Sequence, residues 1–214
     1  MTDPGSVAGS RRDRRKAETR AKLIGAAREV FARQGVDPTS ISEITEAADV
    51  GFGSFYNHFA GKDAIVEAIV EEASAELGEV IDEVVAGIPD AAEVVAVSHR
   101  VIVELAASQP SLGWLMVRLE FSHDMVSRSL APKALRDIDR GIADGRFVVD
   151  DLPAALIASG GALLAVVRAV LAAGGPDPGT AAVHHAAAVL RILGLEASEA
   201  RRVAERTLPA HSVI

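Results

Sequence analysis

Cysteine is absent from this chain of 214 residues, which excludes disulfide bonds, thiolate metal sites and cysteine nucleophiles. Aromatic residues are scarce as well, at 4% of the sequence, although 49% of the residues are hydrophobic. The apolar content is therefore mainly alanine, valine and leucine, which favours a core of packed helices. At this length the chain can form one or two domains with a sizeable core.

Sequence patterns of enzymes are few. The chain has no Gly-x-Ser-x-Gly elbow and no phosphate-binding loop that ends in Lys-Ser or Lys-Thr. Glu120 and His123 have the Glu-x-x-His spacing of a carboxylate metal site, but a di-iron helix bundle needs a second copy, which is missing. We therefore expect no enzymatic activity, no metal site and no cofactor.

Signals for secretion or membrane insertion are weak. The N-terminus is rich in arginine but lacks the adjoining apolar stretch of a signal peptide. Residues 154–173 are apolar enough to suggest a membrane span, yet they lack basic flanks and are interrupted at Ser159, Gly160, Gly161 and Arg168. We expect a buried interface helix here, no membrane association and a cytoplasmic protein.

Residues 40–59 have the pattern of two short helices joined by a turn. Ser40 is a good helix cap, and Glu43 stands three residues later, where its side chain can reach back to the amide of the cap. An apolar stripe at offsets of three and four follows, formed by Ile41, Ile44, Ala47 and Ala48. This spacing predicts an amphipathic helix with small residues where a second helix can cross it.

The turn and the second helix follow directly. Asp49 tolerates a positive φ angle, Val50 can fill the angle between the helices, and Gly51 is a permissive cap. Phe55 and Phe59 repeat at four residues and hold the second helix down. Its free face carries groups that suit the major groove of DNA, namely Phe52, Gly53, Ser54, Tyr56, Asn57 and His58. The pattern predicts a helix-turn-helix that reads DNA.

Charge is divided unevenly along the chain, whose formal net charge is -8. Residues 1–62 contain ten Lys or Arg against eight Asp or Glu, a balance of +2, whereas residues 63–214 contain twelve against twenty-two, a balance of -10. Basic residues cluster just before the helix-turn-helix, at Arg11, Arg12, Arg14, Arg15, Lys16, Arg20 and Lys22. We expect part of this cluster to contact DNA phosphates, the alternative being a solvated, disordered tail.

Between Thr45 and Lys62, the chain contains Ala47-Ala48-Asp49-Val50 and Phe55-Tyr56-Asn57-His58-Phe59-x-x-Lys62. This segment resembles the signature of TetR-family transcriptional regulators, and the likeness extends upstream over residues 20–35. Two positions depart from the family pattern, since Asp49 stands where glycine is usual and Phe52 where a polar residue is common. Phe52 either touches a thymine methyl group or packs against the first helix.

The resemblance implies a ligand-responsive regulator, usually a repressor, that binds a palindromic operator in double-stranded DNA as a homodimer and is released by a small-molecule effector. It implies phosphate contacts by Ser54, Tyr56, His58 and Lys62. It implies base-facing or groove-facing positions for Phe52, Gly53 and Asn57. The predicted DNA-binding residues also include Arg15, Arg20 and Ser40. The alternatives are a core-edge aromatic for Tyr56 and a capped surface imidazole for His58.

Helical segments predict an all-α protein of nine or ten helices, in which a three-helix DNA-binding domain precedes a larger ligand-binding and dimerisation domain. We expect a disordered basic arm, the helix-turn-helix domain, the effector-binding domain and a C-terminal tail at residues 1–13, 14–61, 62–206 and 207–214. Besides the helix-turn-helix, helices are expected at residues 14–34, 62–85, 91–108, 112–121, 132–143, 152–173, 181–193 and 198–205. Pro110 is among the residues that separate them.

The helices expected at 152–173 and 181–193 are apolar around more of their circumference than one core contact requires. Two such helices from each of two subunits would form a four-helix interface with twofold symmetry. The alternative is burial within one chain. Candidate interface residues are Leu156, Gly160, Leu163, Leu164, Val167, Leu171, Val189 and Ile192.

The effector site is the least marked feature of the sequence. Candidate ligand-binding residues are Trp114, Met116, Arg118, Phe121 and His123, with Glu120 as a further polar anchor. Trp114 is the only tryptophan and would more often be a core residue. We interpret the other histidines in predicted helices as surface or interface groups, namely His99, His184 and His185. A purely structural helical dimer is the competing interpretation of the chain, but it gives the basic cluster no role.

Overall fold

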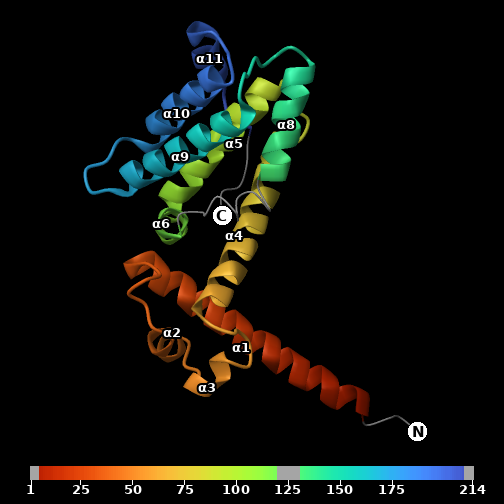
Figure 1. Ribbon diagram of the computed structural model, residues 1–214, viewed down its shortest axis with the longest axis vertical. Coiled ribbons are helices and arrows are strands. Elements are labelled where there is room, and N and C mark those ends of the chain that lie inside the picture. The colour runs from red at the N-terminus through yellow and green to blue at the C-terminus, as the bar shows by residue number, and fades with distance from the viewer. Residues whose placement is uncertain (1–4, 120–130, 210–214) are drawn as a thin grey trace.

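The structure is a computed structural model that describes residues 5–119 and 131–209. Within these ranges the chain is all-helical, with ten helices and no strand, as the sequence predicts. Figure 1 shows a small group of helices at one end of the molecule and a larger group at the other. One long helix leads from the first group into the second.

The small group is N-terminal and consists of α1 (Gly5–Gln34), α2 (Ile41–Ala47) and α3 (Phe52–Phe55). Its core contains Phe31, Ile44 and Phe55, each 0% exposed. Residues 5–13 are helical, which corrects the expectation of a disordered arm. Because arginine and lysine are good helix formers and the sequence has no proline between Pro4 and Pro38, the first helix extends upstream through the basic cluster.

The long helix is α4 (Lys62–Val85), which runs from the small group into the larger body (Figure 1). Its first half buries Ile65 and Ile69, both 0% exposed, in a core shared with α1. An ion pair on the outer side joins Arg28 of α1 to Glu76, with 2.9 Å between Nη2 and Oε2. α1 and α4 are therefore connected both through the core and at the surface.

The larger body contains α5 (Ala91–Ser108), α6 (Pro110–Arg118), α8 (Ala131–Ala143), α9 (Leu152–Leu171), α10 (Pro178–Ile192) and α11 (Ala197–Ala204). Asp90, Asp151 and Asp177 cap α5, α9 and α10 by accepting a hydrogen bond from an amide in the first turn. Pro110, which we expected to separate two helices, instead begins α6. Amides in a first turn have no helical partner, so proline is tolerated there.

The described residues form three apolar clusters, the smallest of which contains Val84, Val97 and Val101. The first extends from α1 and α4 into α5, α6 and α9, and it includes Leu23, Met116 and Val167. The second joins α5 to α8, α9, α10 and α11, and it includes Ile138 and Val189. The first core is therefore continuous across both groups of helices, and α6 packs on α1.

Arg146 links the segment after α8 to two other elements. Its Nε donates to Oδ1 of Asp90 at 2.9 Å, and its Nη1 donates to Oε1 of Glu199 at 2.7 Å. The hydrogen bonds from Arg146 lower the pKa of Asp90, while those to Asp90 and then Glu199 raise the pKa of Arg146 against the opposing effect of burial. These charge pairs hold α11 and the start of α5 together at the end of the body remote from α3 (Figure 1).

Candidate functional site

Ser40 and Glu43 form the capping box that their spacing predicts. Ser40 Oγ accepts the Glu43 amide at 3.2 Å, while Glu43 Oε2 accepts both the amide and the hydroxyl of Ser40 at 2.8 Å. The Ser40 amide, followed by the Gln34 side chain, lowers the pKa of Glu43. The Ser40 hydroxyl is thus bonded to a carboxylate within the protein, and the DNA contact by Ser40 stays a prediction.

The turn between α2 and α3 contains the left-handed residue that the sequence predicts. Asp49 has a φ angle of 53°, and Val50 donates its amide to the Thr45 carbonyl at 2.9 Å. Gly51 follows with an extended backbone and caps α3. Aspartate adopts this region more readily than most residues other than glycine. The departure from the family pattern at Asp49 therefore leaves a hydrogen-bonded turn.

The outer face of α3 and the turn after it is exposed and chemically mixed. Phe52 is 54% exposed and Tyr56 is 53% exposed, which corrects the alternative in which Phe52 packs against the first helix. Asn57 is also exposed, whereas Ser54 and His58 are half-buried. No atom would meet a Cβ within 4 Å at Gly53, so the backbone is open to close approach there. These residues share one end of the molecule, as a DNA-reading surface requires.

Basic residues of α1 lie beside this face. The pKa of His58 is lowered by partial burial and then by the charges of Lys16 and Arg20. Lys16 is exposed, as is Arg15. Lys16 belongs to the basic cluster predicted from the sequence, and its spacing of four from Arg20 places both residues on one face of α1. The structure thus brings a cationic helix face next to the histidine at the end of the helix-turn-helix.

Arg20 is engaged within the protein. Its Nη1 donates to Oε1 of Glu72 on α4 at 2.8 Å, and its guanidinium carbon lies 5.4 Å from the centre of the Phe59 ring. A guanidinium that is paired and stacked in this way holds α1 against α4. Arg20 therefore positions α1 against α4 in this structure, and its phosphate contact stays a prediction.

Lys62 forms three hydrogen bonds within the protein. Its Nζ donates to the backbone carbonyls of Val36, Asp37 and Thr39 at 2.8, 3.1 and 3.0 Å. An ammonium group has three donors, and all three are used. In the structure this side chain holds the loop between α1 and α2, and the phosphate contact by Lys62 stays a prediction. Sequence reasoning missed this role because the carbonyls lie more than twenty residues away.

Three of the predicted ligand-binding residues lie on α6, while Phe121 and His123 are outside the described residues. Met116 is buried in the first core, and Trp114 is half-buried against it. The Arg118 guanidinium lies over the Trp114 ring, 5.2 Å from its centre. Arg118 also approaches Gly35 at the end of α1, and its buried Nε has no hydrogen-bond partner within the described part of the chain. These residues therefore lie where the larger body meets the helix-turn-helix.

Two histidines expected at the surface or an interface instead form a pair between α5 and α10. His99 Nδ1 and His185 Nε2 are 3.0 Å apart, and His185 is 4% exposed. Burial lowers the pKa of His99 to about 3 and that of His185 to about 4. Both rings are therefore neutral at neutral pH. In the described ranges, no group of three potential ligands could hold a metal ion.

α9 is the most apolar exposed feature of the larger body. By length and composition alone it could cross a membrane, which for one helix is weak evidence, and 17% of its most apolar window is buried. Ile157 on this helix is 59% exposed. A helix that is apolar around its circumference but poorly buried leaves a face without an intramolecular partner.

The predicted dimer residues fall into three classes. Val167 and Val189 are 0% and 1% exposed, so they lie inside the chain, where a partner cannot reach them. Gly160 and Ile192 are exposed. The other four predicted dimer residues are half-buried, namely Leu156, Leu163, Leu164 and Leu171. The apolar pattern alone did not distinguish the face turned into the chain from the face turned outward.

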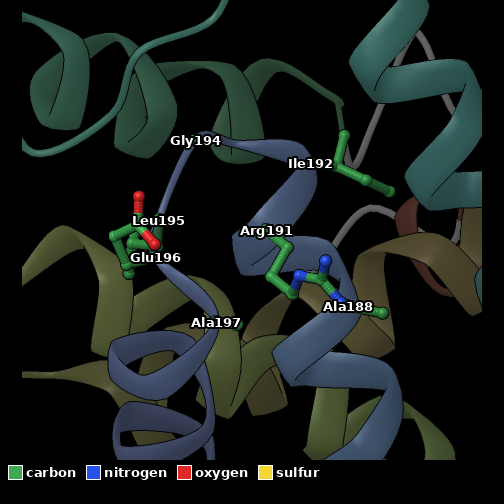
Figure 2. Close-up of a pocket in the computed structure, with 7 residues that line it drawn as sticks. All are labelled: Ala188, Arg191, Ile192, Gly194, Leu195, Glu196 and Ala197. Atoms are coloured by element: carbon green, nitrogen blue, oxygen red, sulfur yellow. The ribbon is translucent and has the colours of Figure 1, made fainter.

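A surface pocket lies where α10 ends and α11 begins, as Figure 2 shows. Its charged lining residues are Arg191 and Glu196, and Ile192 also lines it. It is at the end of the molecule opposite α3 (Figure 1) and contains none of the predicted ligand-binding residues.

Two protein-family models match this chain. Residues 23–69 match the bacterial regulatory proteins of the tetR family, and residues 90–206 match the tetracyclin repressor-like C-terminal domain. The second match alone covers more than half of the chain. Together the two matches correspond to the small N-terminal group of helices with the start of α4, and to the larger body.

Individual proteins show the same relationship. The crystal structure of RolR (NCGL1110) in complex with resorcinol is 36% identical, with a TM-score of 0.76 over 92% of this chain and 98% of that one. UidR of Escherichia coli (strain K12) is 35% identical over 52 residues, or 24% of this chain. AcrR of Shigella flexneri is 39% identical over 62 residues, or 29% of this chain. The chain spans about a quarter of the length of these two curated relatives, 26% of UidR and 29% of AcrR. The chain belongs to the TetR family and is a transcriptional regulator with an N-terminal helix-turn-helix domain and a C-terminal helical domain.

Proposed function

We propose that this protein is a ligand-responsive repressor that binds a palindromic operator as a homodimer and leaves it when a small molecule binds the larger body. The observation that carries the proposal is the exposed mixed face of α3 next to the exposed basic residues of α1. The family matches point to a DNA-binding regulator rather than to an enzyme. We place its action in the cytoplasm, without a membrane partner.

Base contacts are assigned to the exposed face of α3 and the turn that follows it. Asn57 can form two hydrogen bonds to the edge of an adenine, and Gly53 allows the backbone to approach the bases. Phe52 lies on the same exposed face, so it is assigned to the groove as well. Since these groups project from one short element, they span only a few base pairs, and a second subunit is needed for a specific site.

Phosphate contacts are assigned to Ser54, Tyr56 and His58, together with Arg15 and Lys16 of α1. Hydroxyl and basic groups are the usual partners of phosphate oxygens, and they set the register of a protein on the duplex. We assign a positioning role for α1, α2 and the loop between them to Arg20, Ser40 and Lys62, since each forms hydrogen bonds within the protein.

Dimerisation is assigned to the exposed faces of α9 and α10. Ile157 and Gly160 on α9 and Ile192 at the end of α10 lie on surface that one chain leaves uncovered. A second copy would cover this surface by twofold symmetry and present two α3 helices to the same side of the DNA. The matching half-sites would be about 34 Å apart, or a multiple of that distance.

The effector is assigned to the class of small hydroxylated aromatic compounds. RolR, whose structure contains resorcinol, is similar to this chain over nearly its whole length. Trp114 offers an aromatic face, and the buried Nε of Arg118 offers a donor without a partner in the described ranges. Because α6 packs on α1, a ligand that favours another position of α6 would alter the spacing of the two α3 helices.

The proposal is tested with the purified full chain and a library of randomised 30-base-pair duplexes. We expect selection of a palindromic duplex, a dimer by size-exclusion chromatography with light scattering, and a higher Kd when resorcinol is added. Asn57→Ala should change the base preference, whereas Tyr56→Phe should weaken binding to all duplexes alike. A dimer that selects no duplex would contradict the proposal and favour a purely structural helical protein.

A further inference from the structure

Phe52 and Tyr56 form an exposed aromatic pair on the surface of the helix-turn-helix. They are 54% and 53% exposed, and they are the aromatic members of the large apolar side chains exposed in the described residues. Exposure of a phenylalanine ring to water is unfavourable, and more than half of Phe52 remains exposed. The neighbouring Gly51, Gly53 and Asn57 are also exposed, so the pair stands out from its surroundings rather than forming part of a broad apolar patch.

The orientation of Phe52 is fixed by a short series of ring contacts. The Phe52 and Tyr56 rings meet edge to face, with 5.7 Å between centroids and 68° between planes. Tyr56 in turn contacts Phe55 edge to face at 5.5 Å, and Phe55 is completely buried. Such contacts restrict the rotamers of both exposed rings. Phe52 is therefore a supported apolar group and not a freely rotating side chain.

The chemistry of Phe52 limits what it can recognise. A phenyl ring has no hydrogen-bond donor or acceptor, so it cannot read the polar edge of a base or bind a phosphate oxygen. The apolar group that B-DNA presents in its major groove is the C5-methyl group of thymine. Insertion of the ring between base pairs is a minor-groove mode that kinks the duplex, whereas a helix-turn-helix presents its second helix to the major groove.

We propose that Phe52, supported by Tyr56, is a specificity-determining residue that selects thymine through its C5-methyl group. Tyr56 acts on this selection as a positioning residue, through its ring, separately from any phosphate contact by its hydroxyl. The proposal rests on the proposed function, since α3 must enter the major groove for the contact to form.

The test uses the duplex selected by the full chain and a series in which one thymine at a time is replaced by deoxyuridine. Deoxyuridine keeps every hydrogen-bonding group of thymine and removes only the methyl group. We expect at least one position in each half-site at which the replacement weakens binding about fourfold, the cost of one lost buried methyl group. In Phe52→Ala the same replacement should have no effect, since the contact is already absent.

Two variants of Tyr56 test whether its ring supports Phe52. Tyr56→Phe keeps the ring and should keep the full deoxyuridine effect, while Tyr56→Ala should reduce it. Ile142→Ser, at an exposed apolar residue on α8, serves as the control for a surface substitution remote from DNA. Thermal unfolding of each variant verifies that it is folded before its affinity is measured.

The outcomes distinguish a failure of methyl recognition from a failure of the proposed function. If the chain selects a duplex but no deoxyuridine position depends on Phe52, methyl recognition is overturned and the proposed function stands. That result includes the case in which Phe52→Ala weakens binding equally on every duplex, as ring insertion would. If no duplex is selected at all, both proposals fail. If Tyr56→Ala keeps the full deoxyuridine effect, the supporting role of Tyr56 is overturned.

Discussion

The Nζ of Lys62, in the first turn of α4, donates a hydrogen bond to the carbonyl oxygen of Val36 at 2.8 Å. Two further carbonyls in the same loop, those of Asp37 and Thr39, accept from the same atom. The helix that enters the larger body is thereby attached to the loop from which α2 starts. Lys62 positions the helix-turn-helix from within the protein.

Replacing Lys62 by methionine should lower the free energy of unfolding. The change keeps the apolar stem but leaves three carbonyl groups without their charged donor, at a cost of about 1–3 kcal/mol. Urea unfolding should show a lower midpoint with an unchanged slope. Lys133→Met, which removes a surface ion pair with Asp82, is the control and should change stability by less than about 1 kcal/mol. Equal effects of the two variants would contradict the role assigned to Lys62.

Arg15→Ala should weaken binding by a similar factor on every DNA sequence and reduce the slope of log affinity against log salt by about one. Arg15 is exposed on α1 and has no base-reading position, so its contribution is electrostatic. Anisotropy titrations at four salt concentrations measure the slope. Lys62→Met serves as the comparison, because its slope should equal that of the wild type if its ammonium does not contact phosphate.

DNA binding should strengthen as the pH falls from about 8 to about 6, through His58. In the free protein, partial burial and then the charges of Lys16 and Arg20 lower the pKa of His58. A bound phosphate raises that pKa, so the complex takes up a proton and gains affinity below the pKa of the bound state. His58→Asn should flatten the profile measured by anisotropy. A wild-type profile that is already flat would exclude a phosphate close to His58.

Stability should fall as the pH is lowered from about 6.5 toward 5, because of the histidine pair. The folded pKa values of about 3 for His99 and about 4 for His185 are below the unfolded value, so the unfolded state binds more protons throughout this range. By linkage the native state loses stability as protons are added, by up to about 3 kcal/mol per histidine once the pH reaches 4. Urea unfolding at pH 5, 6 and 7 measures the loss.

His185→Gln should reduce this pH dependence, even though it lowers stability at pH 7 by opening the pair. The control is His184→Gln, an exposed neighbour on the same helix, for which the dependence should match that of the wild type. The carboxylates with lowered pKa values, such as Asp90, titrate below this range and do not interfere. If stability falls by the same amount between pH 7 and pH 5 in His185→Gln and His184→Gln, the histidine pair is not the source of the pH dependence.

Ile157→Asp should convert the proposed dimer to a monomer. Ile157 is 59% exposed on the poorly buried helix α9, and a carboxylate in an apolar interface is costly to bury. Light scattering after size-exclusion chromatography measures the mass, and operator affinity should fall with it. Ile142→Asp on α8 is the control and should leave the mass unchanged. If Ile157→Asp remains a dimer, the interface lies elsewhere.

Local signals predicted most of the fold, including the helix-turn-helix. The Ser40–Glu43 capping box, the positive φ of Asp49 and the start of α4 at Lys62 all agree with the structure. They depend on residues within a few positions of one another. The prediction of disorder is wrong for residues 5–13, because the helix propensity of the basic residues outweighs the composition of the segment.

By itself, the sequence determined the helices, their caps and the helix-turn-helix, since hydrogen bonds within a helix and capping depend on neighbours along the chain. Tertiary structure alone decided which polar groups remain available. Lys62 is occupied by carbonyls of a distant loop, Arg20 by Glu72, and His99 by His185. It also decided that Val167 faces the chain while Ile157 faces outward. Such pairings depend on how helices pack, and an apolar or charged residue carries the same sequence signal whichever way it points.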